Sequence, residues 1–321
     1  MELDVITVGE PLVLLAAQQP GPLEAVASFA RHIAGAELNV AIGLARLGLR
    51  SGYISRVGAD SFGRFVSAAL AGDGIDQRHL TVDPLHRTGF MLKSRSDDGT
   101  DPAIEYFRKD SAASHMQLSD LDADYCAACR HLHLTGIYVG VSASTRAVVF
   151  ELAAMARRMG KTVSFYPNLR PSLWPSQAVM VETLNELASL CDWVMPGLAE
   201  GQLLSGRDTP EGIAAFYLVR GARYVLVKLG AQGAFYASAD ESGYAPGVPV
   251  AKVLDTVGAG DGFAVGLISG LLEGLDLRAA TVRGNAIGAR VVQFPGDSDG
   301  LPTRADLLAF LRESSSEARL D

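Results

Sequence analysis

The chain has 321 residues, of which 48% are hydrophobic and 20% charged, enough for one large α/β domain or two moderate ones. Its net charge of −8 and pI near 5.3, without a basic stripe, argue against a nucleic-acid-binding protein. The opening MELDVITVGE lacks a signal-peptide pattern and no long uncharged apolar run follows, so we expect a soluble cytoplasmic protein with no membrane partner.

Strand-like and helix-like patterns alternate along most of the chain. In chain order the predicted strands cover residues 3–9, 51–57, 130–139, 162–166, 192–196 and 223–229, and the predicted helices cover residues 36–48, 62–72, 144–159, 177–190, 211–220 and 262–275. This alternation predicts an α/β fold with a parallel sheet between layers of helices. The polar C-terminal residues 312–321 are expected to fray.

Two segments, residues 12–34 and 86–110, interrupt the alternation with short, turn-rich strand patterns. Within the second, DDGTDP at residues 97–102 predicts a turn. We interpret the two segments as a small antiparallel sheet inserted into the α/β body. Such a sheet could be a lid that keeps water from a reaction site, a flap for dimerisation, or both.

Neither the cysteines nor the histidines form a persuasive metal site. Cys126 and Cys129 form a lone CxxC with no second pair, in a stretch that suits an ordinary helix. His131 and His133 share one face of a predicted strand, and two ligands alone make a weak site. We expect these imidazoles to be satisfied by their neighbours.

The most informative segment is the glycine-rich turn DTVGAGDG at residues 255–262, which precedes a long apolar helix. The first turn of a helix presents free backbone N–H groups and a partial positive charge, and small residues let an anion approach them. Asp261 adds an acid–base group, so the pattern suggests phosphoryl transfer to a hydroxyl. An ordinary strand–helix turn remains the alternative, and neither GxxxxGK[ST] nor GxGxxG is present.

Two motifs resemble the signatures of the ribokinase-like (PfkB) carbohydrate kinases. One is DTVGAGDGFAVGL at 255–267; the other is GAELNVA at 35–41, followed by LARLG at 44–48 and RVGAD at 56–60. The resemblance runs from Val5 to about Asp306. It implies one ribokinase-like three-layer α/β/α domain over residues 1–321, with lid segments at about 12–34 and 86–110. Homo-oligomers through the lid are expected.

Within this family the chain is most similar to kinases of 2-keto-3-deoxygluconate, on the evidence of three further segments. These are GEPLV at 9–13, YFRKDSAAS at 106–114 and PNLRPSLW at 167–174, parts of which fructokinases share. The implied reaction is ATP-dependent phosphorylation of the sugar acid to its 6-phosphate.

The resemblance assigns a role to each matching residue. Asp261 would be the general base, and the backbone of Gly258, Ala259, Gly260 and Asp261 would form an anion hole. The implied nucleotide-binding residues are Lys228, Gly230, Gly233, Gly258, Gly260 and Asn285. The implied substrate-binding residues are Gly35, Asn39, Met91, Tyr106, Arg108, Asn168, Arg170 and Asp261. Mg²⁺ is expected with ATP, held mainly by phosphates and water, with Glu200 as an indirect contact.

Two arginines in the acceptor site favour an acidic sugar, because a guanidinium fork matches a carboxylate. The chain departs from the family pattern at two positions. Tyr166 stands where family members usually carry an aspartate, and Gly197 stands where they carry the asparagine of an Asn-x-x-Glu motif, whose glutamate is Glu200 here. Two alternatives therefore stay open. One is a kinase of a neutral sugar such as fructose, and the other is a catalytically impaired sugar-acid-binding protein on the kinase fold.

Overall fold

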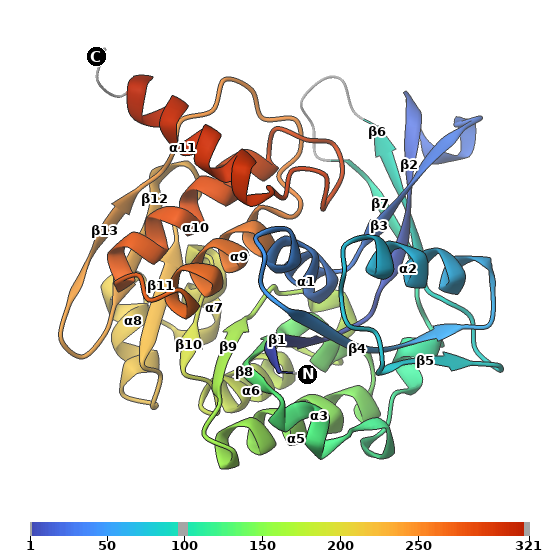
Figure 1. The fold of residues 1–321 in the computed structure, drawn as a ribbon, viewed down its shortest axis with the longest axis horizontal. Coiled ribbons are helices and arrows are strands. Elements are labelled where there is room, and N and C mark those ends of the chain that lie inside the picture. The colour runs from blue at the N-terminus through green and yellow to red at the C-terminus, as the bar shows by residue number, and fades with distance from the viewer. Residues whose placement is uncertain (1, 96–101, 318–321) are drawn as a thin grey trace.

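A large twisted sheet lies at the centre of the computed structural model, which describes residues 2–95 and 102–317 (Figure 1). Within these residues nine strands follow the order β13 (Ser242–Pro246), β12 (Gly233–Ala237), β11 (Tyr224–Lys228), β10 (Trp193–Val194), β9 (Thr162–Tyr166), β8 (Cys129–Thr135), β1 (Leu3–Val8), β4 (Ser51–Gly58) and β5 (Leu80–Asp83). Neighbours from β11 to β5 are parallel, as the alternation predicts. The hairpin β12–β13 is antiparallel and was not predicted.

A second, smaller sheet stands away from the body at the upper right of Figure 1. Its order is β3 (Phe29–Ala34), β2 (Leu12–Pro20), β6 (Phe90–Arg95) and β7 (Ile104–Phe107), so the two segments that break the alternation supply it. The predicted antiparallel arrangement is wrong in the middle, where β2 and β6 are parallel. Because they come from separate segments, no hairpin turn fixes their direction. The predicted turn at 97–102 falls almost entirely on residues 96–101, outside the described part of the chain.

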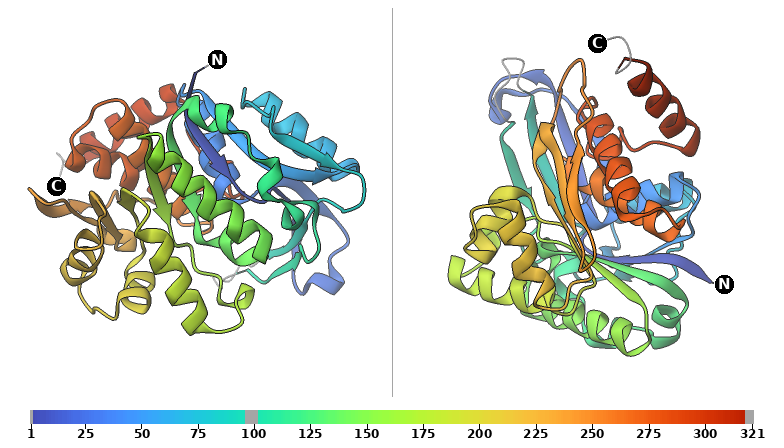
Figure 2. Two further views of the ribbon diagram at one scale, coloured as in Figure 1. Left: turned by 90° about the horizontal axis from the view of Figure 1, so that it is seen from below. Right: turned by 90° about the vertical axis from the view of Figure 1, so that its left-hand side faces the viewer.

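Helices cover both faces of the large sheet, as the two views of Figure 2 show. One layer holds α1 (Ala36–Arg46), α2 (Ser61–Gly72), α9 (Ala259–Leu272), α10 (Leu277–Val291) and α11 (Arg304–Glu317). The other holds α3 (Ala123–Ala127), α4 (Gly136–Val141), α5 (Ala143–Arg158), α6 (Gln177–Ala188), α7 (Leu198–Ser205) and α8 (Pro210–Leu218). The expected three-layer α/β/α architecture is confirmed.

The strands of the large sheet are apolar on both faces because each face is covered. Along β11, Val225 and Val227 pack with α8, whereas Leu226 between them packs with the core under α9 and α10. Successive side chains of a strand point to opposite faces, so a run of valine and leucine contributes side chains to the core on each face of the sheet.

Several predicted boundaries differ from the observed ones; the helix predicted at 262–275, for example, is α9 (Ala259–Leu272). The strand predicted at 130–139 ends at Thr135, whose hydroxyl accepts a hydrogen bond from the N–H of Ile137 at 3.1 Å and caps α4. The apolar run continues through both elements, so hydrophobicity alone could not separate them. Helix α11 continues to Glu317, so residues 312–317 are helical where fraying was expected.

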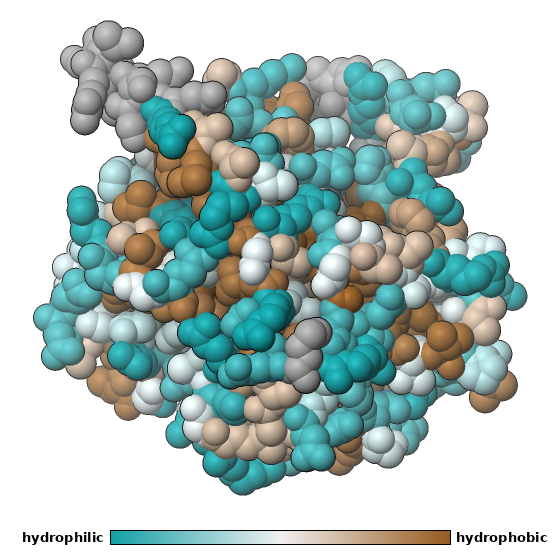
Figure 3. Space-filling model, viewed as in Figure 1, coloured by the Kyte–Doolittle hydropathy of each residue, from teal (hydrophilic) through white to brown (hydrophobic). Residues whose placement is uncertain are grey.

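Hydrophilic and hydrophobic residues intermingle on the face shown in Figure 3, and scattered apolar residues are normal on a folded surface. Among the described residues no helix combines the length and the apolar character needed to cross a membrane. The carboxyl ends of β1, β8 and β9 meet beneath the small sheet. In parallel α/β sheets this edge is where ligands bind.

Candidate active site

A pocket of about 290 Å³ lies at this edge, between the inner face of the small sheet and the starts of α1 and α9. It gathers most of the residues that the sequence singled out. Those lining it are Gly35, Asn39, Met91, Tyr106, Arg108, Asn168, Arg170, Glu200, Gly258, Gly260 and Asp261. Ala259, Lys228, Gly230, Gly233 and Asn285 are not part of its lining.

Asp261 lies buried in the first turn of α9 and faces α1. The amide of Asn39 donates a hydrogen bond to its Oδ2 at 2.9 Å, while its Oδ1 has no partner among the described residues. Burial raises the pKa of Asp261 to about 7, although the hydrogen bond from Asn39 opposes the shift. One oxygen is therefore fixed in place and the other remains available to accept a proton.

The backbone beside Asp261 offers unused donors. Gly258 caps α9 with φ of 83°, and a β-carbon there would lie 2.5 Å from the carbonyl oxygen of Asp297. Among the described residues, the N–H groups of Gly260 and Asp261 make no hydrogen bond, whereas that of Ala259 donates to Thr256 at 3.4 Å. A helix N-terminus with free amides on a pocket is suited to an anion.

The two arginines are not equivalent. The guanidinium of Arg108 pairs with buried Glu10, Nε lying 2.7 Å from Oε2, and the hydroxyl of Ser111 donates to the other Glu10 oxygen at 2.5 Å. Arg170 donates to the carbonyl of Leu169 at 2.9 Å and has no carboxylate partner among the described residues. Arg108 is thus positioned and neutralised by Glu10, whereas Arg170 forms no ion pair with a carboxylate of the described residues.

Glu10 and Glu37 line the pocket but were not predicted as site residues. Glu37 is buried and accepts a hydrogen bond from the hydroxyl of Thr135, and burial raises its pKa to about 7. Both residues lie inside motifs that the sequence displays, GEPLV and GAELNVA. Attention to the acidic residues of those motifs could have found them.

The predicted nucleotide residues meet at one corner beside the pocket. Gly230 and Gly233, with φ of 61° and 100°, turn the chain from β11 into β12. Strand β13 pairs with β12 there, and the amide of Asn285 on α10 donates to the carbonyls of Ala245 and Pro246 at 3.0 and 2.9 Å. Asn285 therefore holds the edge of the sheet, and its amide nitrogen is already used.

A buried ion pair links the small sheet to the glycine-rich turn. The ammonium of Lys93, on the inner face of β6, bonds to Asp255 and lies 3.4 Å from Asp297. The side chains are 6%, 7% and 6% exposed. Because a buried charge is costly unless paired, the position of β6 and that of the turn depend on one another.

Glu200 is tied to the backbone. Its two oxygens accept hydrogen bonds from the N–H groups of Gly197, at 2.6 Å, and Leu169, at 2.9 Å. The first contact closes the start of α7, so Gly197 is tolerated without a capping side chain. Glu200 can reach a cation only with the lone pairs that these amides leave unused.

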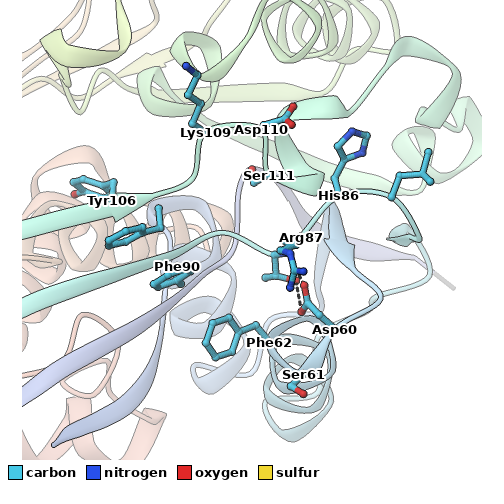
Figure 4. A pocket seen from close by; sticks show the side chains of 13 residues that line it. Asp60, Ser61, Phe62, His86, Arg87, Phe90, Tyr106, Lys109, Asp110 and Ser111 are labelled. Atoms are coloured by element: carbon cyan, nitrogen blue, oxygen red, sulfur yellow. Dashed lines mark hydrogen bonds between the residues drawn. The ribbon is translucent and has the colours of Figure 1, made fainter. Parts of the chain in front are cut away.

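A larger cavity of about 760 Å³ lies between the start of α2 and the segments that flank β6 and β7 (Figure 4). It shares Tyr106 with the smaller pocket but lacks Asp261 and the arginines. His86, Asp110 and His115 each bring one ligand atom within 4.8 Å of the others there. The two imidazole rings are stacked with centroids 3.6 Å apart, and one nitrogen of each already contacts a carboxylate, that of Asp110 for His115 at 2.6 Å and that of Asp83 for His86 at 3.0 Å.

The expectation that neighbours satisfy the histidine pair of β8 is confirmed for His131 but not for Nε2 of His133, which is buried without a hydrogen-bond partner among the described residues. His131 contacts the hydroxyls of Thr162 and Ser164 at 2.8 and 2.7 Å, and His133 contacts that of Ser164 at 2.8 Å. Burial lowers the pKa of His133 to about 3, so it stays neutral. Burial also raises the pKa of the Cys126 thiol to about 12, which makes it unreactive.

A family model, curated relatives and solved structures all relate this chain to carbohydrate kinases. The family model for pfkB family carbohydrate kinases matches residues 3–304. A 2-dehydro-3-deoxygluconokinase of Bacillus subtilis (strain 168) is 49% identical over 312 residues, covering 97% of this chain and 96% of its own. The crystal structure of a PfkB protein from Polaromonas sp. JS666 is 50% identical with a TM-score of 0.89, covering 96% of this chain and 99% of that one. A putative ribokinase II from E. coli, solved in complex with ATP and Mg²⁺, is 30% identical with a TM-score of 0.89, covering 97% and 99%.

Proposed function

This chain belongs to the pfkB family of carbohydrate kinases and has their ribokinase-like fold, and we propose that it phosphorylates 2-keto-3-deoxygluconate at its 6-hydroxyl with ATP. The observation that carries the proposal is the placing of Arg108 and Arg170 in one pocket with Asp261 and the free amides of α9. The two arginines suit an acidic substrate, and Asp261 and the free amides suit phosphoryl transfer.

The surroundings of Arg170 support an acidic acceptor. Glu10 neutralises Arg108 and fixes its orientation, and Arg170 adds a cation without a carboxylate partner among the described residues. A sugar carboxylate would supply the missing negative charge through charge-assisted hydrogen bonds. A neutral sugar would leave Arg170 uncompensated when the pocket closes.

The chemical step uses Asp261 as general base. The 6-hydroxyl oxygen attacks the γ-phosphorus of ATP, the bond from that phosphorus to the bridging oxygen breaks, and ADP leaves with the electron pair. The hydroxyl proton passes to the free Oδ1 of Asp261, which Asn39 holds in position. Charge on the transferring group would be stabilised by the amides of Gly260 and Asp261. A base with a pKa of about 7 is suited to work near neutral pH.

ATP would lie along the corner formed by Lys228–Gly233 and Asn285, with its terminal phosphate at the start of α9. Mg²⁺ neutralises phosphate charge when bound and commonly keeps several waters. The pocket fits such a loosely held ion, since the backbone occupies one lone pair on each Glu200 oxygen. Contact with Glu200 would therefore run through water.

We treat residues 1–321 as one kinase domain whose segments 12–34 and 86–110 form a lid. The edge strands β3 and β7 and the exposed rings of Tyr106 and Phe107, 44% and 47% accessible, suit pairing with the lid of a second copy. The expected place of work is the cytoplasm, where ATP is available and the three free cysteines would stay reduced. Light scattering on purified protein would show whether two copies associate.

The function is tested by a coupled assay for ADP release with Mg²⁺ and four acceptors, namely 2-keto-3-deoxygluconate, its galactonate epimer, fructose and ribose. A kcat/KM for the keto-deoxy acids at least a hundredfold above that for fructose would support the proposal. Preference for fructose would make the protein a neutral-sugar kinase. Binding of the acid without turnover would make it a binding protein.

A further inference from the structure

Tyr166, at the end of β9, points its hydroxyl at the glycine-rich turn. A β-carbon added at Gly260 would lie 2.4 Å from the phenolic oxygen, so only glycine leaves room for this contact. The residue lines the pocket, and its hydroxyl makes no hydrogen bond within the described part of the chain. The phenol therefore stands beside the free amides of α9 with its donor unused.

Lys228, at the end of β11, lies behind the same ring. Its ammonium nitrogen is 3.1 Å from the ring centroid, is shielded from solvent and has no hydrogen-bond partner among the described residues. A buried ammonium without hydrogen bonds is costly, and the face of one aromatic ring compensates only part of that cost. Burial lowers the pKa of Lys228 to about 8, although the charges of Glu200 and Asp261 oppose the shift, so the ammonium can supply positive charge behind the phenol at neutral pH.

We propose that Tyr166 is a further catalytic residue, whose hydroxyl donates a hydrogen bond to the transferring phosphoryl group, and that Lys228 behind it positions the ring and adds positive charge. This inference rests on the proposed phosphoryl transfer. The phenol keeps its proton throughout, since Asp261 accepts the proton of the attacking hydroxyl. Burial holds the pKa of Tyr166 well above its usual value, so the group remains a donor at neutral pH.

The position of the hydroxyl favours phosphate over sugar as its partner. Gly260 carries one of the free amides that face a phosphoryl group, whereas the sugar carboxylate would lie with Arg108 and Arg170. A group that binds only in the transition state changes kcat, and a group that binds the sugar changes KM. The two roles are therefore separable by kinetics.

The test compares Tyr166→Phe, which keeps the ring on Lys228, and Lys228→Met with the wild type. Tyr224→Phe, outside the pocket lining, is the matched control. We expect Tyr166→Phe to lower kcat about a hundredfold, the usual effect of one lost donor to a reacting anion, with an unchanged KM for the sugar acid and an unchanged Tm. Lys228→Met should lower kcat at least tenfold without lowering Tm, because it removes an unpaired buried charge.

Binding of ADP with aluminium fluoride and Mg²⁺, an analogue of the transferring group, gives a second readout that needs no sugar. It should be weakened in Tyr166→Phe, while binding of ADP alone stays the same. A wild-type kcat in Tyr166→Phe, or an effect on KM alone, would overturn the inference. If the wild type phosphorylates only fructose, the acceptor assignment fails, whereas a hundredfold loss of kcat on fructose in Tyr166→Phe still supports the role of Tyr166.

Discussion

At the scale of single residues, the contact between Asp261 and Asn39 is what the proposed general base depends on. Helix α1 brings an amide to one oxygen, burial raises the pKa of Asp261, and the other oxygen is buried without a hydrogen-bond partner among the described residues. The motif around Asp261 predicted a general base, and that role stays a proposal. The partner Asn39 lies 222 residues away in sequence, so only the packing of α1 on α9 reveals the hydrogen bond.

The activity should follow the ionisation of Asp261. Since its pKa is about 7 and only the carboxylate can accept a proton, kcat/KM should rise as pH increases toward 7 and level off above it. Asp261→Asn should lower kcat by about 10²- to 10⁴-fold, the usual contribution of a general base. A flat profile from pH 5.5 to 8 in the wild type would contradict this role.

Asp261→Asn should also be more stable than the wild type at neutral pH. The folded-state pKa of Asp261, about 7, lies above the ordinary 3.8, so the folded protein binds the proton more tightly and loses stability as pH rises between these values. The Tm advantage of Asp261→Asn should therefore grow from pH 4 to pH 7 and stay constant above. An advantage that shrinks over this range would show that the carboxylate is stabilised by folding.

The two arginines should respond differently to substitution. Arg170→Gln removes a cation with no carboxylate partner among the described residues. It should lower kcat/KM for the sugar acid by about 10- to 100-fold, as expected for a lost charge-assisted hydrogen bond, with little change in Tm. Arg108→Gln leaves buried Glu10 with the hydrogen bond from Ser111 but without a counter-charge, and should also cost about 3–5 kcal/mol of stability. Equal Tm values for the two variants would contradict the pairing of Arg108 with Glu10.

At the scale of elements, the small sheet and the glycine-rich turn form a coupled pair. Lys93 of β6 reaches Asp255 and Asp297, and Met91 and Tyr106 of the same sheet line the pocket. The sequence predicted where this sheet lies in the chain, because its strand patterns interrupt the alternation. It could not predict the parallel pairing of β2 with β6 or the buried lysine, since both depend on contacts between distant segments.

Removing the ion pair between Lys93 and the two aspartates should destabilise both the small sheet and the glycine-rich turn. Lys93→Met leaves two buried carboxylates without a counter-charge, so we expect a loss of about 3–5 kcal/mol in the free energy of unfolding. The KM for ATP should also rise, because the turn that starts α9 loses its support. Lys252→Met, an exposed lysine on the adjacent segment, is the matched control and should behave as the wild type in chemical denaturation. Similar stability of the two variants would show that the ion pair is dispensable.

At the scale of the whole molecule, seven parallel strands from β11 to β5 bring their carboxyl ends to one edge, and the pocket follows from that arrangement. Local periodicity predicted six of these strands, because each is short, apolar and bounded by turns, and it missed β5. The hairpin β12–β13 and the boundary between β8 and α4 were missed, since their residues carry no distinct pattern. The contact of Tyr166 with Lys228 emerges only when the strand ends are brought together, whereas Glu10 and Glu37 lie in motifs that the sequence displays.

The most direct measurement is a competition among 2-keto-3-deoxygluconate, fructose and ribose at equal concentration with limiting ATP and Mg²⁺. Phosphorus NMR and mass spectrometry would identify the product and the position of the phosphate. We expect nearly all the phosphate on C6 of the sugar acid, and a smaller share there with Arg170→Gln. Phosphate mainly on fructose or ribose would contradict the sugar-acid assignment.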